Sequence, residues 1–271
     1  MHNLLKGKRG IISGALDPNS IAWKVAERCH AEGATFTLTN APIALRLGTI
    51  NQLAEATGSK VIGCDVTQQA DMDKLVQESQ EVLGGKLDFV LHSIGMSLNI
   101  RKGRPYTDLD YDHMHKTLDI SAMSWHRLLQ TCYKAEAINE GGSMLALSYI
   151  ASQRVFPDYS EMADAKSMLE SITRSFGYHY GKAKGVRVNT ISQSPTKTTA
   201  GSGVKGFDAF YDYADMMSPL GNASADECAD YCVMLFSDYT RKVTMQNLFH
   251  DGGFSFTGIS QDVVEQMTKG M

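Results

Sequence analysis

Two tyrosines and a lysine lie at spacings that suit acid–base chemistry. Tyr149 precedes Tyr159 by ten residues, and Lys166 follows Tyr159 by seven. Because seven helical residues at 100° each return to within about 20° of the starting direction, a helix would place Tyr159 and Lys166 on one face, about 10 Å apart along its axis. Lys166 could then hold a cofactor ribose while Tyr159 faces a substrate. The nearby ammonium is also expected to lower the pKa of Tyr159.

Short β-rich runs alternate with helical patterns along the chain that must position these residues. Apolar side chains fill nearly every position of 88–91 and 144–147, as expected for strands covered on both faces. The predicted strands are 10–13, 34–39, 60–64, 87–92, 142–148, 186–191 and 245–250, and the predicted helices cover about 20–32, 68–83, 109–138, 160–182 and 224–237. This alternation predicts an α/β fold: a single doubly wound Rossmann-type domain over 1–271, with a seven-stranded parallel sheet and helices on both faces.

The composition excludes several classes of protein. The chain has 271 residues, of which 26 are Lys or Arg and 30 are Asp or Glu, for a formal charge of −4. This mild acidity disfavours nucleic-acid binding. No apolar run reaches the ~20 residues of a membrane span, and no signal-peptide core is present. With five scattered cysteines, we expect a cytoplasmic protein with reduced thiols and no metal site.

The segment after the first predicted strand has the pattern of a phosphate cradle. Gly14 opens a loop that leads into a helix beginning near Ser20 and Ile21. Backbone N–H groups at a helix N-terminus bind anions, so this loop is expected to hold the phosphates of a dinucleotide. Only one glycine of the usual G-x-G-x-x-G is present, and an ordinary strand–helix loop is the alternative. Asn19 or Ser20 is expected to cap the helix.

The ends of three further strands predict the path of the same dinucleotide. Their candidate cofactor-binding residues are Ala41, Asp65, Val66, Ser93, Ile94 and Gly95. The Asp65 carboxylate could accept a hydrogen bond from an adenine amino group, and Gly95 permits close approach to a ribose. The second strand lacks the acidic residue that often binds an NAD ribose, although Arg46 could reach a 2′-phosphate. His92 is expected to pack within its strand.

Several groups of residues, in order along the chain, resemble those of the bacterial enoyl-acyl-carrier-protein reductases of the NADH-dependent type, a divergent branch of the short-chain dehydrogenases. They are Gly14 with 20–22, then 64–66, 92–95, 147–149, Tyr159 with Met162 and Lys166, 186–189 and 251–255. The resemblance covers about residues 6–256. The spacing of the two tyrosines and the lysine is its most specific part.

The resemblance implies a reaction and a set of site residues. NADH, with NADPH as the other possibility, would deliver hydride to C3 of a trans-2-enoyl thioester carried by acyl carrier protein in fatty-acid elongation. Tyr159 would donate a hydrogen bond to the thioester oxygen, Lys166 would bind the nicotinamide ribose, and Tyr149 would line the site. The implied nicotinamide turn contains Pro195, Thr196, Thr198 and Ala200, and the implied substrate contacts are Ser97, Tyr149, Tyr159, Met162 and Phe207.

Two surface features bear on the partners that the resemblance implies. The segment 196–217 would be a mobile lid over the acyl chain, for which an amphipathic core helix is the alternative. Arg101, Lys102 and Arg104 form a basic cluster that could dock an acidic carrier protein, for which a solvated surface loop is the alternative. The family also implies a homotetramer.

Two other functions remain open from the residues. A short-chain dehydrogenase acting on a carbonyl would use Ser148 and Tyr159 as the polarising pair, and a nucleotide sensor would bind NAD(H) without turnover. Tyr178 and Lys182 have the Tyr-x-x-x-Lys spacing of the commoner dehydrogenases. They lie about 28 Å along a continuous helix from Tyr159, so we interpret them as surface or packing residues.

Overall fold

Seven parallel strands form one sheet in the order β3-β2-β1-β4-β5-β6-β7 in the computed structural model, which describes residues 2–199, 201 and 206–269. The strands are β1 (Arg9–Ser13), β2 (Thr35–Asn40), β3 (Lys60–Gly63), β4 (Leu87–His92), β5 (Ile138–Ser148), β6 (Arg187–Gln193) and β7 (Asn247–His250). The chain winds outward from β1 to β3 and then crosses to β4, which creates a switch point between β1 and β4. The predicted doubly wound parallel sheet is confirmed.

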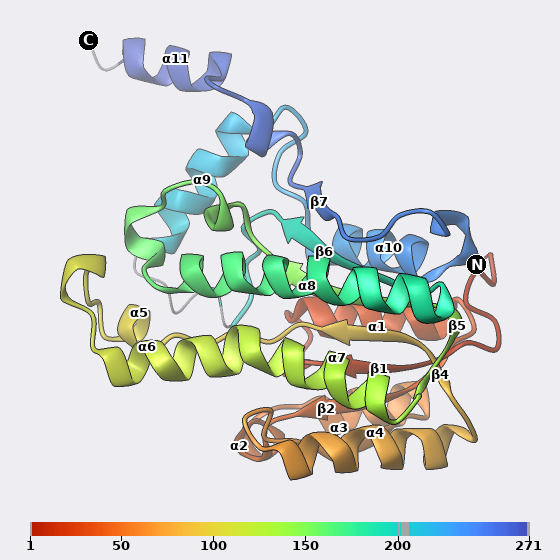
Figure 1. The fold of residues 1–271 in the computed structure, drawn as a ribbon. Coiled ribbons are helices and arrows are strands. Elements are labelled where there is room, and N and C mark those ends of the chain that lie inside the picture. Colours follow the sequence, from red (N-terminus) through yellow and green to blue (C-terminus); the bar gives the residue numbers. More distant parts are fainter. Residues whose placement is uncertain (1, 200, 202–205, 270–271) are drawn as a thin grey trace.

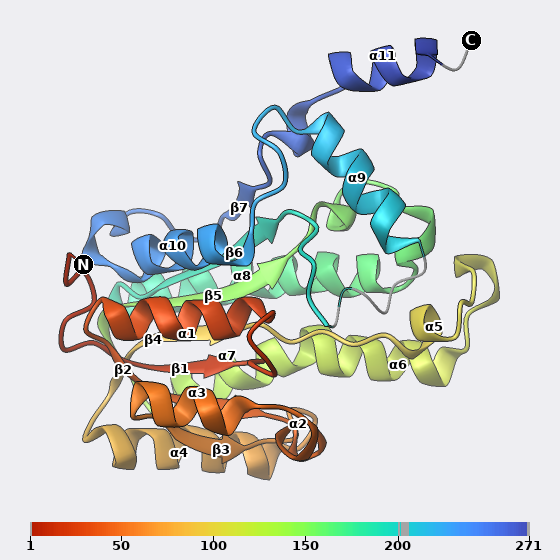
Figure 2. The ribbon, with the colours of Figure 1, turned by 180° about the vertical axis from the view of Figure 1, so that it is seen from behind.

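Helices cover both faces of this sheet (Figure 1). The helices are α1 (Ile21–Ala31), α2 (Pro42–Leu47), α3 (Ile50–Thr57), α4 (Gln69–Leu83), α5 (Leu98–Arg101), α6 (Tyr111–Leu118), α7 (Ser124–Lys134), α8 (Met162–Lys184), α9 (Phe207–Met217), α10 (Ala225–Phe236) and α11 (Gln261–Lys269). Helices α4, α7 and α8 pack on one face. Helices α1, α3 and α10 pack on the other, as Figure 2 shows from behind.

Helix α1 shows how the sequence pattern produces this packing. Its predicted apolar stripe of Ala22, Val25, Ala26 and Cys29 is buried against α10 and the sheet. Gly33 follows the helix with φ +88°, the left-handed conformation that terminates helices at glycine. All five cysteines are buried and free, so they act as small apolar side chains.

Two regions differ from the predicted elements. The single helix expected over 109–138 consists of α6, a π-helical turn (Asp119–Met123) and α7, and β5 already begins at Ile138. The chain turns from α7 into β5 at Glu136, which adopts φ +49°. Helices α2 and α3, which were not predicted, have six and eight residues, too few for the 3.6-residue period to stand out.

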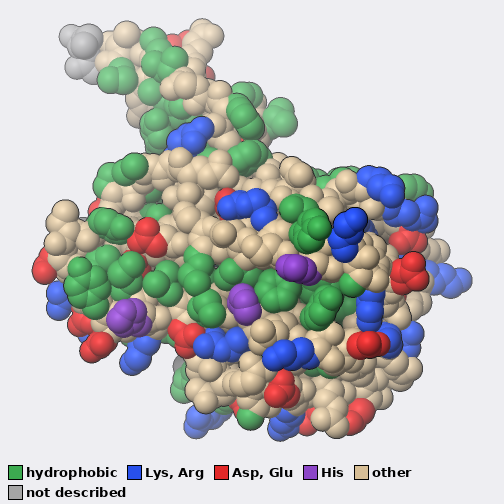
Figure 3. Space-filling model, in the orientation of Figure 1, with side chains coloured by type: hydrophobic (Ala, Val, Ile, Leu, Met, Phe, Trp, Pro, Cys, Tyr) green, Lys and Arg blue, Asp and Glu red, His purple; other side chains and the backbone are tan. Residues whose placement is uncertain are grey.

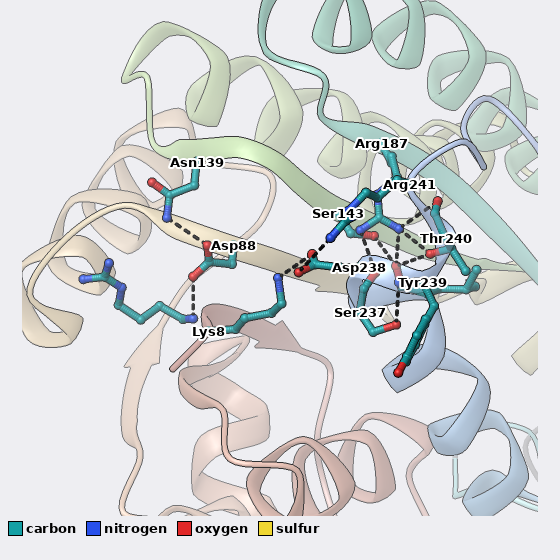
Figure 4. A network of polar contacts seen from close by, with 12 residues as sticks. Lys8, Asp88, Asn139, Ser143, Arg187, Ser237, Asp238, Tyr239, Thr240 and Arg241 are labelled. Atoms are coloured by element: carbon teal, nitrogen blue, oxygen red, sulfur yellow. Dashed lines mark hydrogen bonds and ion pairs between the residues drawn. The ribbon is translucent and has the colours of Figure 1, made fainter. Parts of the chain in front are cut away.

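A polar network closes the amino end of the sheet (Figure 4). The buried Arg187 side chain at the start of β6 donates to the carbonyl oxygens of Leu235 at 2.7 Å and Ser237 at 3.1 Å. Lys8 pairs with Asp238 at 3.0 Å in the same network. The Arg187 bonds help to satisfy carbonyl groups at the C-terminus of α10, together with the Ser143 hydroxyl, which donates to the same Leu235 oxygen at 2.8 Å.

The opposite, carboxyl ends of the strands carry the loops that lead to α5 and α9 (Figure 1). Helix α11 projects from the body of the molecule beyond α9, as both views show. Within the described residues we find no helix with both the length and the apolarity of a membrane span.

Candidate active site

A cavity of about 340 Å³ opens at the carboxyl ends of β4, β5 and β6. It brings together most of the predicted site residues, namely Ile21, Ser93, Ile94, Gly95, Ser97, Tyr149, Tyr159, Met162, Lys166, Pro195, Thr196, Thr198 and Phe207. Five other predicted residues do not line it: Gly14, Ser20, Ala41, Asp65 and Val66. Ala200 lies outside the described residues. The cavity therefore encloses one end of the predicted dinucleotide path.

Tyr159 reaches the cavity from a different element than predicted. It ends a 3₁₀ turn (Pro157–Tyr159), whereas α8 begins at Met162, so Tyr159 and Lys166 do not share a continuous helix. Between them Ser160 adopts φ +47° and ψ −143°. A non-glycine residue in such a conformation costs about 1–3 kcal/mol, which the surrounding contacts must offset. The strained turn therefore presents Tyr159 beside the first turn of α8.

Lys166 is buried on α8 and points toward the end of β5. Its Nζ donates a hydrogen bond of 2.7 Å to the carbonyl oxygen of Leu147. Burial lowers the pKa of Lys166 to about 8, although the nearby Glu170 carboxylate acts in the opposite direction. The amine is thus fixed at the cavity wall and is less basic than an exposed lysine.

The predicted lowering of the Tyr159 pKa is wrong. Burial raises the pKa of Tyr159 above its ordinary value, because the desolvated phenolate is disfavoured. The pKa of Tyr149 is also raised, mainly by burial and further by Tyr159 and Asp251. Both phenols are consequently neutral at physiological pH and can donate hydrogen bonds.

Aromatic rings form the wall around these phenols. The ring centroids of Tyr149 and Tyr159 are 5.1 Å apart, and Phe156 lies 5.3 Å from Tyr149. Phe210 of α9 lies 5.1 Å from Phe156. Ring pairs at these separations exclude water and hold one another in place. The Tyr149 hydroxyl is buried and, among the described residues, has no hydrogen-bond partner, which leaves its donor available to a ligand.

Two glycines leave space where a dinucleotide is expected. Gly14 has φ +95°, and a Cβ there would stand 1.9 Å from the Ser93 carbonyl oxygen, so the loops after β1 and β4 meet only because this residue is glycine. A Cβ on Gly95 would lie 3.9 Å from Lys166 Nζ and extend into the space beside the amine. The residues present therefore fit an extended cofactor that passes both loops.

The helix after Gly14 keeps its first N–H groups available. Ser20 stands at the N-cap of α1, but its hydroxyl accepts from Leu16 N and Asp17 N, both at 3.1 Å, and caps no helical N–H. The expected capping bond from Asn19 or Ser20 is therefore absent, because the loop uses the Ser20 oxygen. Unpaired N–H groups at a helix start are suited to a phosphate.

The predicted adenine-end residues lie at the same sheet edge but outside the cavity. The Asp65 carboxylate accepts from Thr67 N at 3.0 Å and from Thr67 Oγ1 at 2.7 Å. The backbone N–H of Ala41 donates to the Asn40 side chain at 2.8 Å. These bonds shape the loops after β3 and β2. His92 packs as predicted: it is buried, lies 2.7 Å from Ser124 Oγ, and has its pKa lowered to about 3 by burial.

The side chain of Gln193 braces the loop after β6. Gln193 donates to Ala223 O at 3.0 Å, and its side-chain oxygen lies 2.7 Å from His250 Nδ1. These contacts hold the start of the turn through Pro195 and Thr198 that lines the cavity. Helix α9 follows this turn and contributes Phe207 and Phe210 to the cavity.

Comparison with known proteins agrees with this geometry. A family model described as Enoyl-(Acyl carrier protein) reductase matches residues 14–255. The chain belongs to this reductase family. The reductase is 36% identical over 261 residues to Enoyl-[acyl-carrier-protein] reductase [NADH] 2 of Rhizobium meliloti (strain 1021), with 96% of each chain covered. It is 30% identical over 267 residues to Enoyl-[acyl-carrier-protein] reductase [NADH] FabI of Escherichia coli (strain K12), covering 95% and 97%.

A solved structure is similar over nearly the whole reductase. The FabI–NADH complex from Alistipes finegoldii has a TM-score of 0.97 and 59% identity, covering 99% of this chain and 95% of that chain.

Sequence reasoning missed two buried glutamates behind the cavity of the reductase. Glu170 accepts from Ser148 Oγ at 2.6 Å and from Ser152 Oγ at 2.5 Å, one helical turn beyond Lys166. Glu161 accepts from three side chains near the start of α8. Glu170 could have been found from its spacing, because it follows Lys166 by four residues and therefore lies on the same face of the helix, where most side chains are apolar.

Replacing Lys166 should change how stability depends on pH. The folded-state pKa of about 8 lies below the ordinary lysine value of about 10.5, so between these values the unfolded chain binds the additional proton. Stability contributed by Lys166 therefore rises with pH above about 8. We expect the unfolding free energy of wild type minus Lys166→Met to increase by about 2–3 kcal/mol between pH 7 and 10.5, as measured by urea unfolding. The exposed Lys182→Met is the control, and a difference that stays constant with pH would contradict the expectation.

Proposed function

We propose that this chain reduces the C2=C3 double bond of trans-2-enoyl thioesters on acyl carrier protein in fatty-acid elongation, with NADH as the reductant. One observation carries the proposal: a neutral, half-buried Tyr159 and an anchored Lys166 meet in one cavity at the carboxyl edge of the sheet. NADH, when bound, supplies the hydride that C3 of the substrate accepts. The NADH-dependent relatives support this choice of cofactor.

The residues that would hold NADH extend along this edge. The start of α1 and Gly14 suit the phosphates, while Asp65, Val66 and Ala41 suit the adenosine end. Lys166 suits the nicotinamide ribose, because its amine stands beside the space that Gly95 leaves open. Ser93, Ile94, Pro195, Thr196, Thr198 and Ala200 complete the proposed set, with Ser20 and Ile21 at the helix start.

Tyr159 is proposed to stabilise the negative charge that develops on the thioester oxygen. Its raised pKa keeps the proton on the phenol, so the hydroxyl can donate to that oxygen in a water-poor wall of aromatic rings. Tyr149 lines the same side with an unsatisfied hydroxyl. Ser97, Met162 and Phe207 would contact the substrate. Met96 also lines the cavity, whereas Met216 and Met217 of α9 do not.

The carbonyl-reductase alternative loses support at Ser148. In that alternative the Ser148 hydroxyl must donate to the substrate, but it donates to Glu170 at 2.6 Å. The sensor alternative leaves the pair of buried phenols and the anchored amine without a role.

We also propose that residues 1–271 form a single cytoplasmic domain, with the substrate enclosed against the same sheet as the cofactor. Helix α9 would cover the acyl chain, because Phe207 and Phe210 already face the cavity. Thr196 and Thr198, earlier in the 196–217 segment, line the same cavity, which supports this placement.

A substrate assay with a conservative variant tests the proposal. The protein should oxidise NADH with a trans-2-enoyl thioester and leave a ketoacyl thioester unchanged. Tyr159→Phe should lower kcat by about 100-fold or more, because it removes one oxyanion donor, while the Kd for NADH stays within about twofold. Tyr178→Phe, an exposed tyrosine on α8, is the matched control. Turnover of only the ketoacyl substrate, or binding without turnover, would reject the proposed reaction.

Carrier-protein docking is proposed at the basic cluster beside the cavity. Arg101 lines the cavity mouth, and Lys102 and Arg104 are exposed next to it. Reversing Arg101 and Lys102 to Glu should raise KM for an enoyl-acyl-carrier-protein at least about fivefold more than KM for a small neutral enoyl thioester. The pair Arg241→Glu and Lys242→Glu, near the amino end of the sheet, is the matched control. An equal change in KM for both substrates would show that the cluster does not dock the carrier protein.

A homotetramer is proposed on the basis of the family and one exposed face. Figure 3 shows hydrophobic and histidine side chains gathered over α7 and α8. Tyr133 of α7 and Tyr178 of α8 are 43% and 54% exposed. Apolar surface of this kind commonly marks an interface. Light scattering should give about four times the chain mass, and a monomer mass would contradict the proposal.

A further inference from the structure

Glu161 is a fully buried carboxylate beside the active-site turn. Its side chain is 0% exposed, and it stands at the N-cap of α8, two residues after Tyr159. One carboxylate oxygen, Oε1, accepts three hydrogen bonds: from Ser97 Oγ at 2.7 Å, from Thr117 Oγ1 at 2.8 Å and from Asn99 Nδ2 at 3.2 Å. These donors replace the hydration of Oε1, whereas the buried Oε2 has no hydrogen-bond partner among the described residues.

The three donors come from segments that are far apart in the sequence but border the same cavity. Ser97 caps α5 in the loop after β4 and itself lines the cavity, and its hydroxyl also accepts from Ile100 N at 3.0 Å. Asn99 joins this loop to the start of α6 through two bonds with the backbone of Asp110, each 3.1 Å long. Thr117 lies on the last turn of α6. Glu161 therefore connects the loop after β4, α6 and the start of α8.

The donors keep this carboxylate charged. Burial alone would raise the pKa of Glu161, but hydrogen bonds from Ser97 and Thr117 reverse the effect, and the net pKa lies below the ordinary value. Hydrogen bonds to an ionised acceptor are about twice as strong as neutral ones. These hydrogen bonds fix Glu161 in place. Glu161 directly follows Ser160, the residue with φ +47° that ends the turn bearing Tyr159.

We propose that Glu161 is a positioning residue for the reduction: its charged side chain holds the Tyr159 turn in register with the Ser97 loop, so that the phenol faces the substrate. The inference rests on the proposed reductase function and goes beyond it. Glu161 does not line the cavity, so it acts through Tyr159 and Ser97 and not by contact with NADH.

Two conservative variants test this role. Glu161→Gln keeps the shape but replaces the charged acceptor with a neutral one, and Thr117→Val removes one donor at a residue that does not line the cavity. We expect kcat for an enoyl thioester to fall about tenfold in Glu161→Gln and about threefold in Thr117→Val, since sub-ångström displacement of a catalytic group costs this much. The Kd for NADH should stay within about twofold in both. The double variant should be no slower than Glu161→Gln alone, because the two residues act through one contact.

Glu32→Gln is the matched control. Glu32 is another buried carboxylate, remote from the cavity, which accepts hydrogen bonds from the backbone N–H groups of His2 and Leu4. It should lose thermal stability with kcat unchanged. If Glu161→Gln and Thr117→Val behave like this control, or if their losses in kcat multiply, the positioning role is wrong although the reductase function stands. A wild-type protein without enoyl turnover would overturn the proposed function and this inference together. If Glu161→Gln fails to fold, Thr117→Val alone decides through its kcat.

Discussion

The buried amine of Lys166 needs an acceptor, and it finds the carbonyl oxygen of Leu147 at 2.7 Å. This contact joins α8 to the end of β5, which is the point where the sheet presents its central strands to the cavity. Because the amine is desolvated, its pKa falls to about 8. Burial also raises the pKa of Tyr159, so the phenol on the same cavity wall keeps the proton that its proposed donor role requires.

Two glutamates support the site from behind, and they do so differently. Glu170 accepts hydrogen bonds from the hydroxyls of Ser148 and Ser152, so the Ser148 hydroxyl is not free to donate to a substrate. Glu161 connects the turn of Tyr159 to the loop after β4 and to α6. Both carboxylates are buried, so each depends on donors from separate elements, and any shift of those elements would leave a charge unsatisfied. The arrangement makes the cavity wall resist small displacements.

The fold and much of the site were predictable because they rest on local patterns. Strand–helix alternation specified the parallel sheet, and parallel strands necessarily bring their carboxyl ends to one edge, which gathered Gly95, Tyr149 and Lys166. The helix over 109–138 was mispredicted because a π-helical turn and the left-handed Glu136 leave no clear mark on hydrophobic periodicity. The location of Tyr159 before α8 was missed for the same reason, since Ser160 breaks the helix without a glycine or proline.

The sequence by itself determined the class of fold, the family and the residue types at the site, because these depend on spacing and on alternation along the chain. Only the tertiary structure decided the ionisation of Tyr159, the direction of the Lys166 amine and the partners of Glu161 and Glu170. Those properties depend on desolvation and on donors contributed by distant segments. Thr117, for example, lies 44 residues before Glu161 in the chain but 2.8 Å from its carboxylate in the fold. No local pattern contains that distance.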